Sequence, residues 1–147
     1  MRIYCDGIFD LFHVGHIKTL EYIKNMFDNV TVIVGVISDE DAEKYKRKPI
    51  INEIDRGISL KSCRFVDEII QHVPLIINEY FLLKNNIDLV VHGFYNQYDK
   101  EKQKEFFKIP IKLNKFKEIP YSHVESTSGI IDRIVKQFKQ VNICDEL

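Results

Sequence analysis

The sequence predicts an α/β fold in which one parallel sheet carries helices on both faces. Residues 30–37 form a nearly unbroken β-branched run, which is typical of a strand covered on both sides. Residues 87–92 form a second apolar run, and predicted helices alternate with the strands along the chain. At 147 residues the chain has the length of one domain, so we expect a single domain over residues 1–147.

The elements follow from local patterns taken in chain order. The strands are expected at residues 1–5, 30–37, 64–70, 87–92 and 115–119. The helices are expected at residues 16–27, 39–45, 54–62, 78–85 and 127–140. The first helix is predicted because Ile17, Leu20 and Ile23 fall on one helical face, and Ser38 and Ser126 are suitable N-caps for two others. The lysine-rich residues 94–114 show no clear pattern and receive no prediction.

The composition excludes several classes of protein. The chain is 45% hydrophobic and 29% charged with a net charge of −1, which favours a globular fold and gives no sign of nucleic-acid binding. Its apolar runs are strand-sized, so we expect no transmembrane segment, and Met1 leads directly into a strand rather than a signal peptide. Cys5, Cys63 and Cys144 are widely spaced, which favours reduced thiols in the cytoplasm and no metal site in the protein.

Two basic stretches need separate interpretations. Seven lysines between residues 100 and 117 alternate with acidic residues, which favours a solvated face. Lys44, Lys46, Arg47 and Lys48 instead follow a predicted strand and its helix directly. Polyphosphate binding is therefore a serious alternative for this first cluster.

The most informative stretch is Gly7–His16, GIFDLFHVGH, which lies where the first strand gives way to a helix. In a parallel sheet, ligands bind beyond the carboxyl ends of the strands. Gly7 and Gly15 would let the backbone approach a phosphate, and the helix start offers free N–H groups. His13 and His16 would add side-chain N–H donors. The alternative, two histidines in polar core positions, explains the combination less well.

These residues resemble the cytidylyltransferases of the HxGH nucleotidyltransferase superfamily. Cys5–His13 is closest to the choline-phosphate enzymes, and residues 33–40, 52–56, 63–70 and 87–92 continue the resemblance in order. It spans about residues 2–135 and implies a Rossmann-like fold. It also implies a homodimer, with Phe65 and its neighbours near the subunit contact.

The activity that the resemblance implies is in-line attack of an alcohol phosphomonoester on the α-phosphate of CTP, with pyrophosphate leaving together with Mg²⁺. Phosphocholine is the favoured acceptor. The catalytic residues that it implies are His13, His16 and Lys46. The nucleotide-binding residues that it implies are Gly7, Ile8, Phe9, Gly15, Arg56, Ser126 and Thr127. Those for the alcohol phosphate are Asp6, Lys46, His92 and Tyr95. Arg56 and Arg64 could equally form ion pairs that stabilise the fold.

The sequence departs from the family at two places. Residues 121–127 replace the family's Arg-Thr-Glu-Gly-Ile-Ser-Thr and retain only Ser126 and Thr127, so Tyr121 stands where the family has an arginine for the triphosphate. Lys117, Arg133 or His123 could substitute for that arginine. Leu75 stands at the family's tryptophan, and Gly93 resembles the ethanolamine-phosphate enzymes.

Three hypotheses follow. The first is an active phosphocholine or phosphoethanolamine cytidylyltransferase. The second is a weakened or regulatory nucleotide-binding homologue, and the third is a nucleotidyltransferase that uses glycerol 3-phosphate or ATP. The membrane-sensing helix that follows the catalytic domain in eukaryotic choline enzymes is not expected in this chain.

Overall fold

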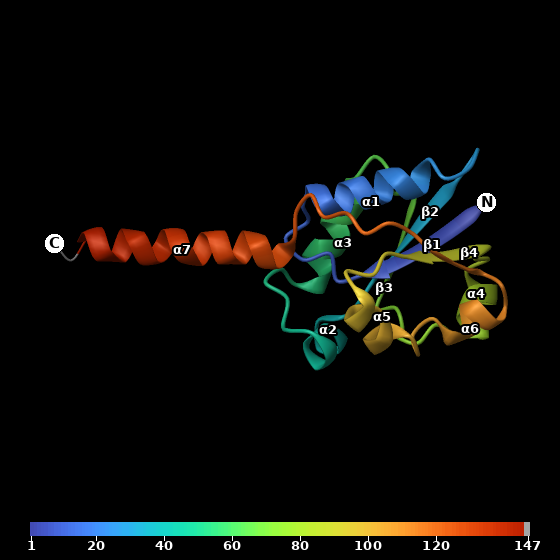
Figure 1. Cartoon of the computed structure of the whole chain (residues 1–147). Helices are drawn as coiled ribbons and strands as arrows, with labels where there is room; N and C mark the ends of the chain where they lie inside the picture. Colours follow the sequence, from blue (N-terminus) through green and yellow to red (C-terminus); the bar gives the residue numbers. More distant parts are fainter. Residues whose placement is uncertain (146–147) are drawn as a thin grey trace.

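Five parallel strands form one sheet in the order β3-β2-β1-β4-β5 (Figure 1). The computed structural model describes residues 1–145, with side chains to residue 139. The strands are β1 (Arg2–Gly7), β2 (Thr31–Val36), β3 (Glu68–Gln71), β4 (Leu89–His92) and β5 (Phe116–Glu118). Tyr4 lies opposite Ile33 on β2 and Val90 on β4. The chain therefore winds outward from β1 to β3 and then returns to the other side of β1, as in Rossmann-like folds.

The helices cover both faces of this sheet. They are α1 (Val14–Lys24), α2 (Asp39–Tyr45), α3 (Glu53–Lys61), α4 (Glu79–Lys84), α5 (Gln97–Gln103), α6 (Lys108–Lys112) and α7 (Thr127–Asp145). Figure 1 shows α1 and α3 on one face, and α2, α4, α5 and α6 on the other. The predicted fold class is confirmed.

The core has one half on each face because successive side chains of a strand point in opposite directions. Ile3 and Cys5 of β1 pack with Leu20 of α1 and Leu60 of α3. Tyr4, between them, lies in the other half. A Cβ atom on Gly35 of β2 would lie 2.2 Å from the Tyr4 hydroxyl oxygen, so this ring requires glycine beside it.

Helix α7 extends away from the sheet and its covering helices (Figure 1). Ser126 caps its first turn by accepting from the Gly129 N–H at 3.0 Å, as predicted. Ile134, Val135 and Phe138 are exposed along it. No helix within residues 1–145 combines the length and apolar character needed to cross a bilayer.

Most element predictions are confirmed, with three differences. Helix α1 starts at Val14 instead of residue 16 because His13 is its N-cap. Residues 64–66 belong to a turn, since the Val66 N–H bonds the Cys63 carbonyl at 3.0 Å and the strand starts only at Glu68. Residues 94–114, which received no prediction, contain α5 and α6. Cys5 and Cys63 are free thiols, and the side chain of Cys144 lies outside the described residues.

Candidate active site

A pocket of about 600 Å³ opens beyond the carboxyl ends of β1 and β4. This is the point at which the strand order reverses, where open α/β sheets bind their ligands. Of the predicted site residues, those that line it are Asp6, Gly7, Ile8, Phe9, His16, Lys46, His92, Tyr95, Ser126 and Thr127. His13, Gly15 and Arg56 do not belong to the described lining.

The spacing of the two histidines is that of a reciprocal helix cap. The His13 Nδ1 atom accepts from the Gly15 N–H at 3.1 Å, and the His16 Nδ1 atom accepts from the His13 N–H at 3.3 Å. The two rings stack with their centroids 3.8 Å apart. Because each Nδ1 accepts, each ring carries its hydrogen on Nε2. The motif therefore fixes both rings as N–H donors at the N-terminus of α1.

Both imidazoles are held in the neutral form. Burial lowers the pKa of His16 to about 3, and the neighbouring His13 ring and Lys46 ammonium lower it further. Burial also lowers the pKa of His13, although Glu125 opposes this shift. Lys46 and His16 both line the pocket. The histidine pair can therefore donate hydrogen bonds to an anion, but it cannot supply a positive charge at neutral pH.

His13 reaches the pocket through Thr127. The His13 Nε2 atom lies 3.3 Å from the Thr127 Oγ1 atom, and that hydroxyl donates to the Asp10 carbonyl at 3.1 Å. Since Thr127 is the first residue of α7 and lines the pocket, this chain of bonds joins α7 to the histidine pair.

Gly15 is required for a reason other than the predicted approach to a ligand. A Cβ atom there would lie 2.7 Å from the Glu125 carbonyl oxygen and 2.9 Å from the His13 ring. The segment before α7 therefore packs directly on the start of α1. Gly7 does line the pocket, but a Cβ atom there would lie 2.9 Å from the Phe9 ring.

Asp10 joins the β1–α1 loop to the loop that carries Lys46. Its buried carboxylate accepts from the Ile50 and Ile51 N–H groups, both at 2.9 Å, and from Arg47 at 3.1 Å. These bonds keep the pKa of Asp10 below its usual range against the opposing effect of burial. Phe9 and Leu11, on either side, have φ of 55° and 54°, a strained conformation that the surrounding contacts must hold.

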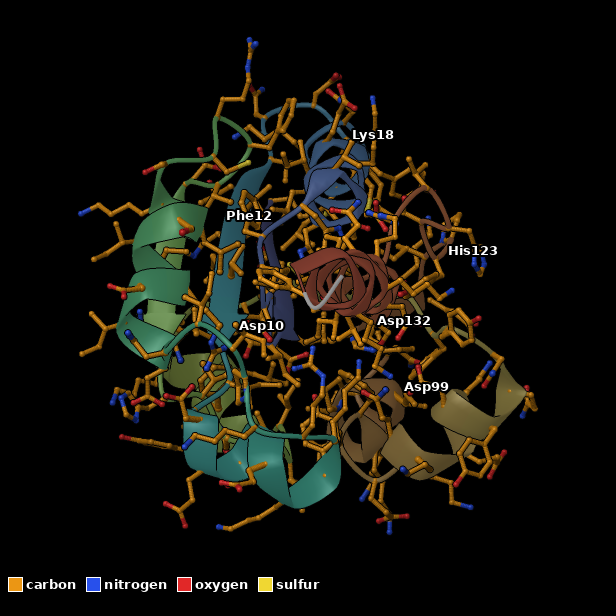
Figure 2. All side chains as sticks on the ribbon, turned by 90° about the vertical axis from the view of Figure 1, so that its left-hand side faces the viewer. Asp10, Phe12, Lys18, Asp99, His123 and Asp132 are labelled. Carbon is orange, nitrogen blue, oxygen red and sulfur yellow. The ribbon has the colours of Figure 1, made fainter. Side chains whose placement is uncertain are left out.

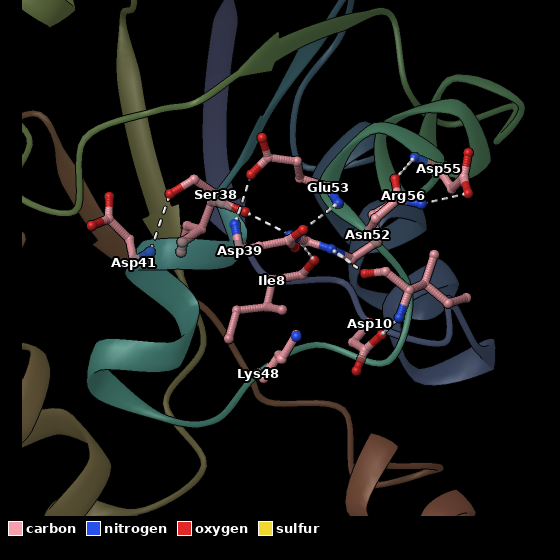
Figure 3. Close-up of polar contacts among 12 residues, drawn as sticks. Ile8, Asp10, Ser38, Asp39, Asp41, Lys48, Asn52, Glu53, Asp55 and Arg56 are labelled. Carbon is pink, nitrogen blue, oxygen red and sulfur yellow. Dashed lines mark hydrogen bonds and ion pairs between the residues drawn. The ribbon is translucent and has the colours of Figure 1, made fainter.

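Figure 3 shows the polar contacts of Arg56, which is absent from the pocket lining. Its side chain is fully buried, and its guanidinium donates to the carbonyls of Ile8, Ile51 and Ile37 and to Asp39. The structure therefore gives Arg56 the position of a residue that stabilises the fold, which the sequence left open. Its bond to Ile8 orients the backbone beside the pocket.

The pocket lining also contains acidic and aromatic side chains. The Asp6 side chain is only 6% exposed, and its Oδ1 atom lies 3.7 Å from the His92 Nδ1 atom. No donor within residues 1–139 makes a hydrogen bond to the Asp6 carboxylate. Burial raises the pKa of Tyr45, and the carboxylates of Asp6 and Asp99 add to that shift. Tyr45, Asp6 and Asp99 all line the pocket.

Tyr121 also lines the pocket. Its ring lies 5.4 Å from that of Tyr95 and 4.9 Å from that of His123, in tilted or edge-on contacts. Burial raises the pKa of Tyr121, and Asp99 contributes to the shift. Asp99, Lys102 and Gln103 line the pocket from α5 and were missed because residues 94–114 received no prediction of secondary structure. No pattern in that stretch could have identified them.

The sequence matches the cytidylyltransferase-like family over residues 4–139. The chain belongs to this family. The resemblance inferred from the HVGH motif is thus confirmed. In sequence the chain is 39% identical over 141 residues to choline-phosphate cytidylyltransferase 2 of Arabidopsis thaliana, covering 95% of this chain and 46% of that relative. It is 40% identical over 139 residues to the choline-phosphate cytidylyltransferase of Saccharomyces cerevisiae, covering 94% and 32%.

The chain is also similar to an ethanolamine-phosphate enzyme and to a protein of known structure. An ethanolamine-phosphate cytidylyltransferase of Arabidopsis thaliana is 34% identical over 137 residues, covering 90% of this chain and 32% of that relative. The crystal structure of a lipopolysaccharide core biosynthesis protein from Thermoplasma volcanium superposes with a TM-score of 0.64 at 25% identity, covering 82% and 97% of the two chains. The cytidylyltransferase-like chain spans less than half the length of each of these three curated relatives.

Proposed function

We propose that this cytidylyltransferase-like chain transfers CMP from CTP to phosphocholine, giving CDP-choline and pyrophosphate for phospholipid synthesis. The observation that carries the proposal is the HVGH cap beside a pocket that also holds Asp6, whose buried carboxylate accepts no hydrogen bond within residues 1–139. The first feature suits a phosphate at the reaction centre. The second suits a cationic alcohol, since a carboxylate among aromatic rings attracts an ammonium group.

In the proposed reaction, a phosphate oxygen of the acceptor attacks the α-phosphorus of CTP. The bond to the β-phosphate oxygen breaks, and pyrophosphate leaves. The Nε2–H group of His16 would donate to an α-phosphate oxygen as charge builds there, and that of His13 would exchange its contact with the Thr127 hydroxyl for a second phosphate oxygen. The Lys46 ammonium would bridge the two substrates. Ser126 and Thr127 and the backbone from Gly7 to Phe9 would hold the nucleotide. Lys46, His92 and Tyr95 would hold the alcohol phosphate, with Asp6 near the ammonium group.

Mg²⁺ is proposed to enter with CTP. Residues 1–139 contain no group of three or more His, Cys, Asp or Glu side chains that could hold a metal ion. This fits an ion bound chiefly through substrate phosphates, as Mg²⁺ commonly is, where it neutralises charge on the leaving group.

Phosphoethanolamine is the second candidate acceptor. Gly93 resembles the ethanolamine-phosphate enzymes, and a Cβ atom there would lie 3.3 Å from the carbonyl oxygens of Ile119 and Pro120, so a larger residue would require the neighbouring backbone to shift by a few tenths of an ångström. Asp6 argues against glycerol 3-phosphate, because the neutral head of that acceptor would leave this buried carboxylate without a cationic partner.

The test measures pyrophosphate release with CTP and each of phosphocholine, phosphoethanolamine and glycerol 3-phosphate, with ATP replacing CTP as a control. We expect kcat/KM for phosphocholine to exceed that for glycerol 3-phosphate at least tenfold. Equal use of all acceptors would contradict the role of Asp6. No turnover with tight CTP binding would favour a regulatory homologue.

We also propose a cytoplasmic homodimer. The free thiols of Cys5 and Cys63 support the location. The dimer is supported by Ile54 and Ile58, one helical turn apart on α3, which are 65% and 60% exposed. Phe65 follows this helix, with the Arg64 guanidinium 5.6 Å from the centre of its ring. Such an exposed apolar stripe favours a subunit contact.

A further inference from the structure

The substrates of the proposed reaction carry several negative charges, and the pocket offers few cations to meet them. The Lys and Arg residues that line the described pocket are Lys46, Arg47 and Lys102. Arg47 already pairs with Asp10 and donates to the Lys48 carbonyl. Within residues 1–139, neither Lys46 nor Lys102 is paired with a carboxylate. The ammonium groups of these two lysines are therefore available to a negatively charged ligand in the pocket.

Lys102 differs from its neighbours on α5. Lys100 pairs with Glu118 on β5, and Lys104 pairs with Glu101 at 3.7 Å on the same helix. The Lys102 ammonium instead lies 5.5 Å from the centre of the Tyr98 ring, an uncharged partner that also lines the pocket. Lys102 thus differs from Lys100 and Lys104 in having no carboxylate partner within the described residues.

The nearest carboxylate on the same helix face, Asp99, is already engaged. It accepts from the Tyr95 N–H at 3.0 Å and from the Gln103 side chain at 2.7 Å. Asp99, Lys102 and Gln103 share one face of α5, three and four residues apart. This hydrogen bonding leaves the Lys102 charge available to a ligand.

The segment of the pocket lining that carries Lys102 packs against the segment that carries Lys46. Phe106, four residues after Lys102, packs on the Tyr45 ring with centroids 5.8 Å apart. Tyr45 immediately precedes Lys46, and all four residues line the pocket. Figure 2, viewed along α7, shows Asp10 of the β1–α1 loop to the left of the α7 axis and Asp99 of α5 to its lower right. A phosphate chain in the pocket would thus pass between a cation from each of the two segments.

The sequence suggests Lys117, Arg133 and His123 as replacements for the family's arginine. Each of them lies outside the pocket lining or is already paired with a carboxylate. The Lys117 ammonium lies 5.7 Å from the Phe27 ring centre, beside a separate pocket next to α1. Arg133 forms an ion pair with Glu125 at 2.6 Å. His123 packs against Tyr95 and Tyr121, and it does not line the described pocket.

We propose that Lys102 binds the β- and γ-phosphates of CTP, opposite Lys46, and supplies the charge that Tyr121 cannot. The inference rests on the proposed function, because it assumes that the pocket takes CTP. Lys102 is exposed and lines the pocket, whereas the buried Asp6 carboxylate suits the ammonium group of the alcohol.

The experiment compares Lys102→Gln with Lys104→Gln, a matched control on the same helix outside the pocket. Calorimetry measures the Kd of Mg·CTP and of magnesium pyrophosphate, and kinetics measure KM for CTP and phosphocholine. We expect Lys102→Gln to weaken CTP and pyrophosphate binding about tenfold, or about 1.4 kcal/mol, with Lys102→Arg restoring most of it. Lys104→Gln should stay within about twofold of the wild type, the variation expected of a surface change.

The outcomes separate the two proposals. If the wild-type chain is active and Lys102→Gln binds CTP like Lys104→Gln, the role of Lys102 is overturned and the proposed function stands. A rise in KM for phosphocholine alone would also overturn it, because Lys102 would then serve the acceptor. If the wild type is inactive but Lys102→Gln loses CTP affinity, the CTP site stands without the transferase activity. If the wild type binds no CTP, both proposals fail.

Discussion

Replacing Arg56 with methionine tests whether this residue stabilises the fold or binds the nucleotide. Methionine keeps much of the side chain's length but has no donor. The substitution would leave the carbonyls of Ile8, Ile37 and Ile51 without the guanidinium to which they are bonded. An unsatisfied buried polar group costs about 1–3 kcal/mol, and breaking a buried ion pair costs about 3–5 kcal/mol.

The cost of losing the ion pair between Arg56 and Asp39 is smaller than that of a fully buried pair. The Asp39 side chain is 38% exposed, so water can replace the guanidinium there. The three carbonyls have less access to water and carry most of the cost. We therefore expect Arg56→Met to lower the free energy of unfolding by about 3–5 kcal/mol.

The assay is urea unfolding followed by circular dichroism at 25 °C. Arg64→Met serves as the control, because Arg64 is exposed and its loss should cost about 0.5 kcal/mol or less. Asp39→Asn should cost less than the Arg56 change. A loss below about 1 kcal/mol in Arg56→Met, combined with a large drop in CTP affinity, would refute the structural role and return Arg56 to the nucleotide.

Three further predictions concern pH, Tyr121 and assembly. Because the folded state holds His16 neutral with its pKa lowered to about 3, the unfolded chain binds more protons below pH about 6.5. The free energy of unfolding should therefore fall as pH drops from about 6.5 toward 5. The His16→Gln variant should show a smaller dependence of this free energy on pH. An unchanged dependence in the variant would contradict the burial of His16 as a neutral ring. If Lys102 meets the triphosphate, Tyr121→Arg should give no gain in kcat/KM for CTP, whereas a clear gain that shrinks at high salt would indicate a vacant phosphate site. Light scattering at micromolar concentration should give the mass of a dimer, and Phe65→Glu should shift it toward the monomer; a monomeric wild type would refute the dimer.

The strands and the first three helices could be predicted because local signals agree with the packing. Residues Val32–Val36 of β2 are wholly buried, as the β-branched composition of this run predicted. The helix over residues 39–45 begins where Ser38 can cap it, and the Ser38 hydroxyl accepts from the Asp41 N–H at 3.2 Å. In these segments the local pattern and the tertiary contacts favour the same structure.

The parts that could not be predicted depend on contacts between distant residues. Helix α5 has no buried residues, so its sequence carries no apolar period, and its position is set by what surrounds it. The close approach of Glu125 to Gly15, 110 residues away, explains that glycine better than any ligand. The burial of Arg56 likewise depends on Ile8 and Ile37, which the sequence cannot place beside it.

The most direct test of the central claim measures CDP-choline formation from CTP and phosphocholine by the wild type and by His16→Ala, both at saturating substrates. A His16→Ala variant that remains folded, as shown by its circular dichroism, isolates the contribution of this donor to the barrier. We predict that the wild type forms CDP-choline and that kcat of the variant falls below a tenth, a loss of more than about 1.4 kcal/mol of transition-state stabilisation. A folded variant that keeps more than a tenth of wild-type kcat would contradict the claim that the HVGH cap stabilises the reacting phosphate.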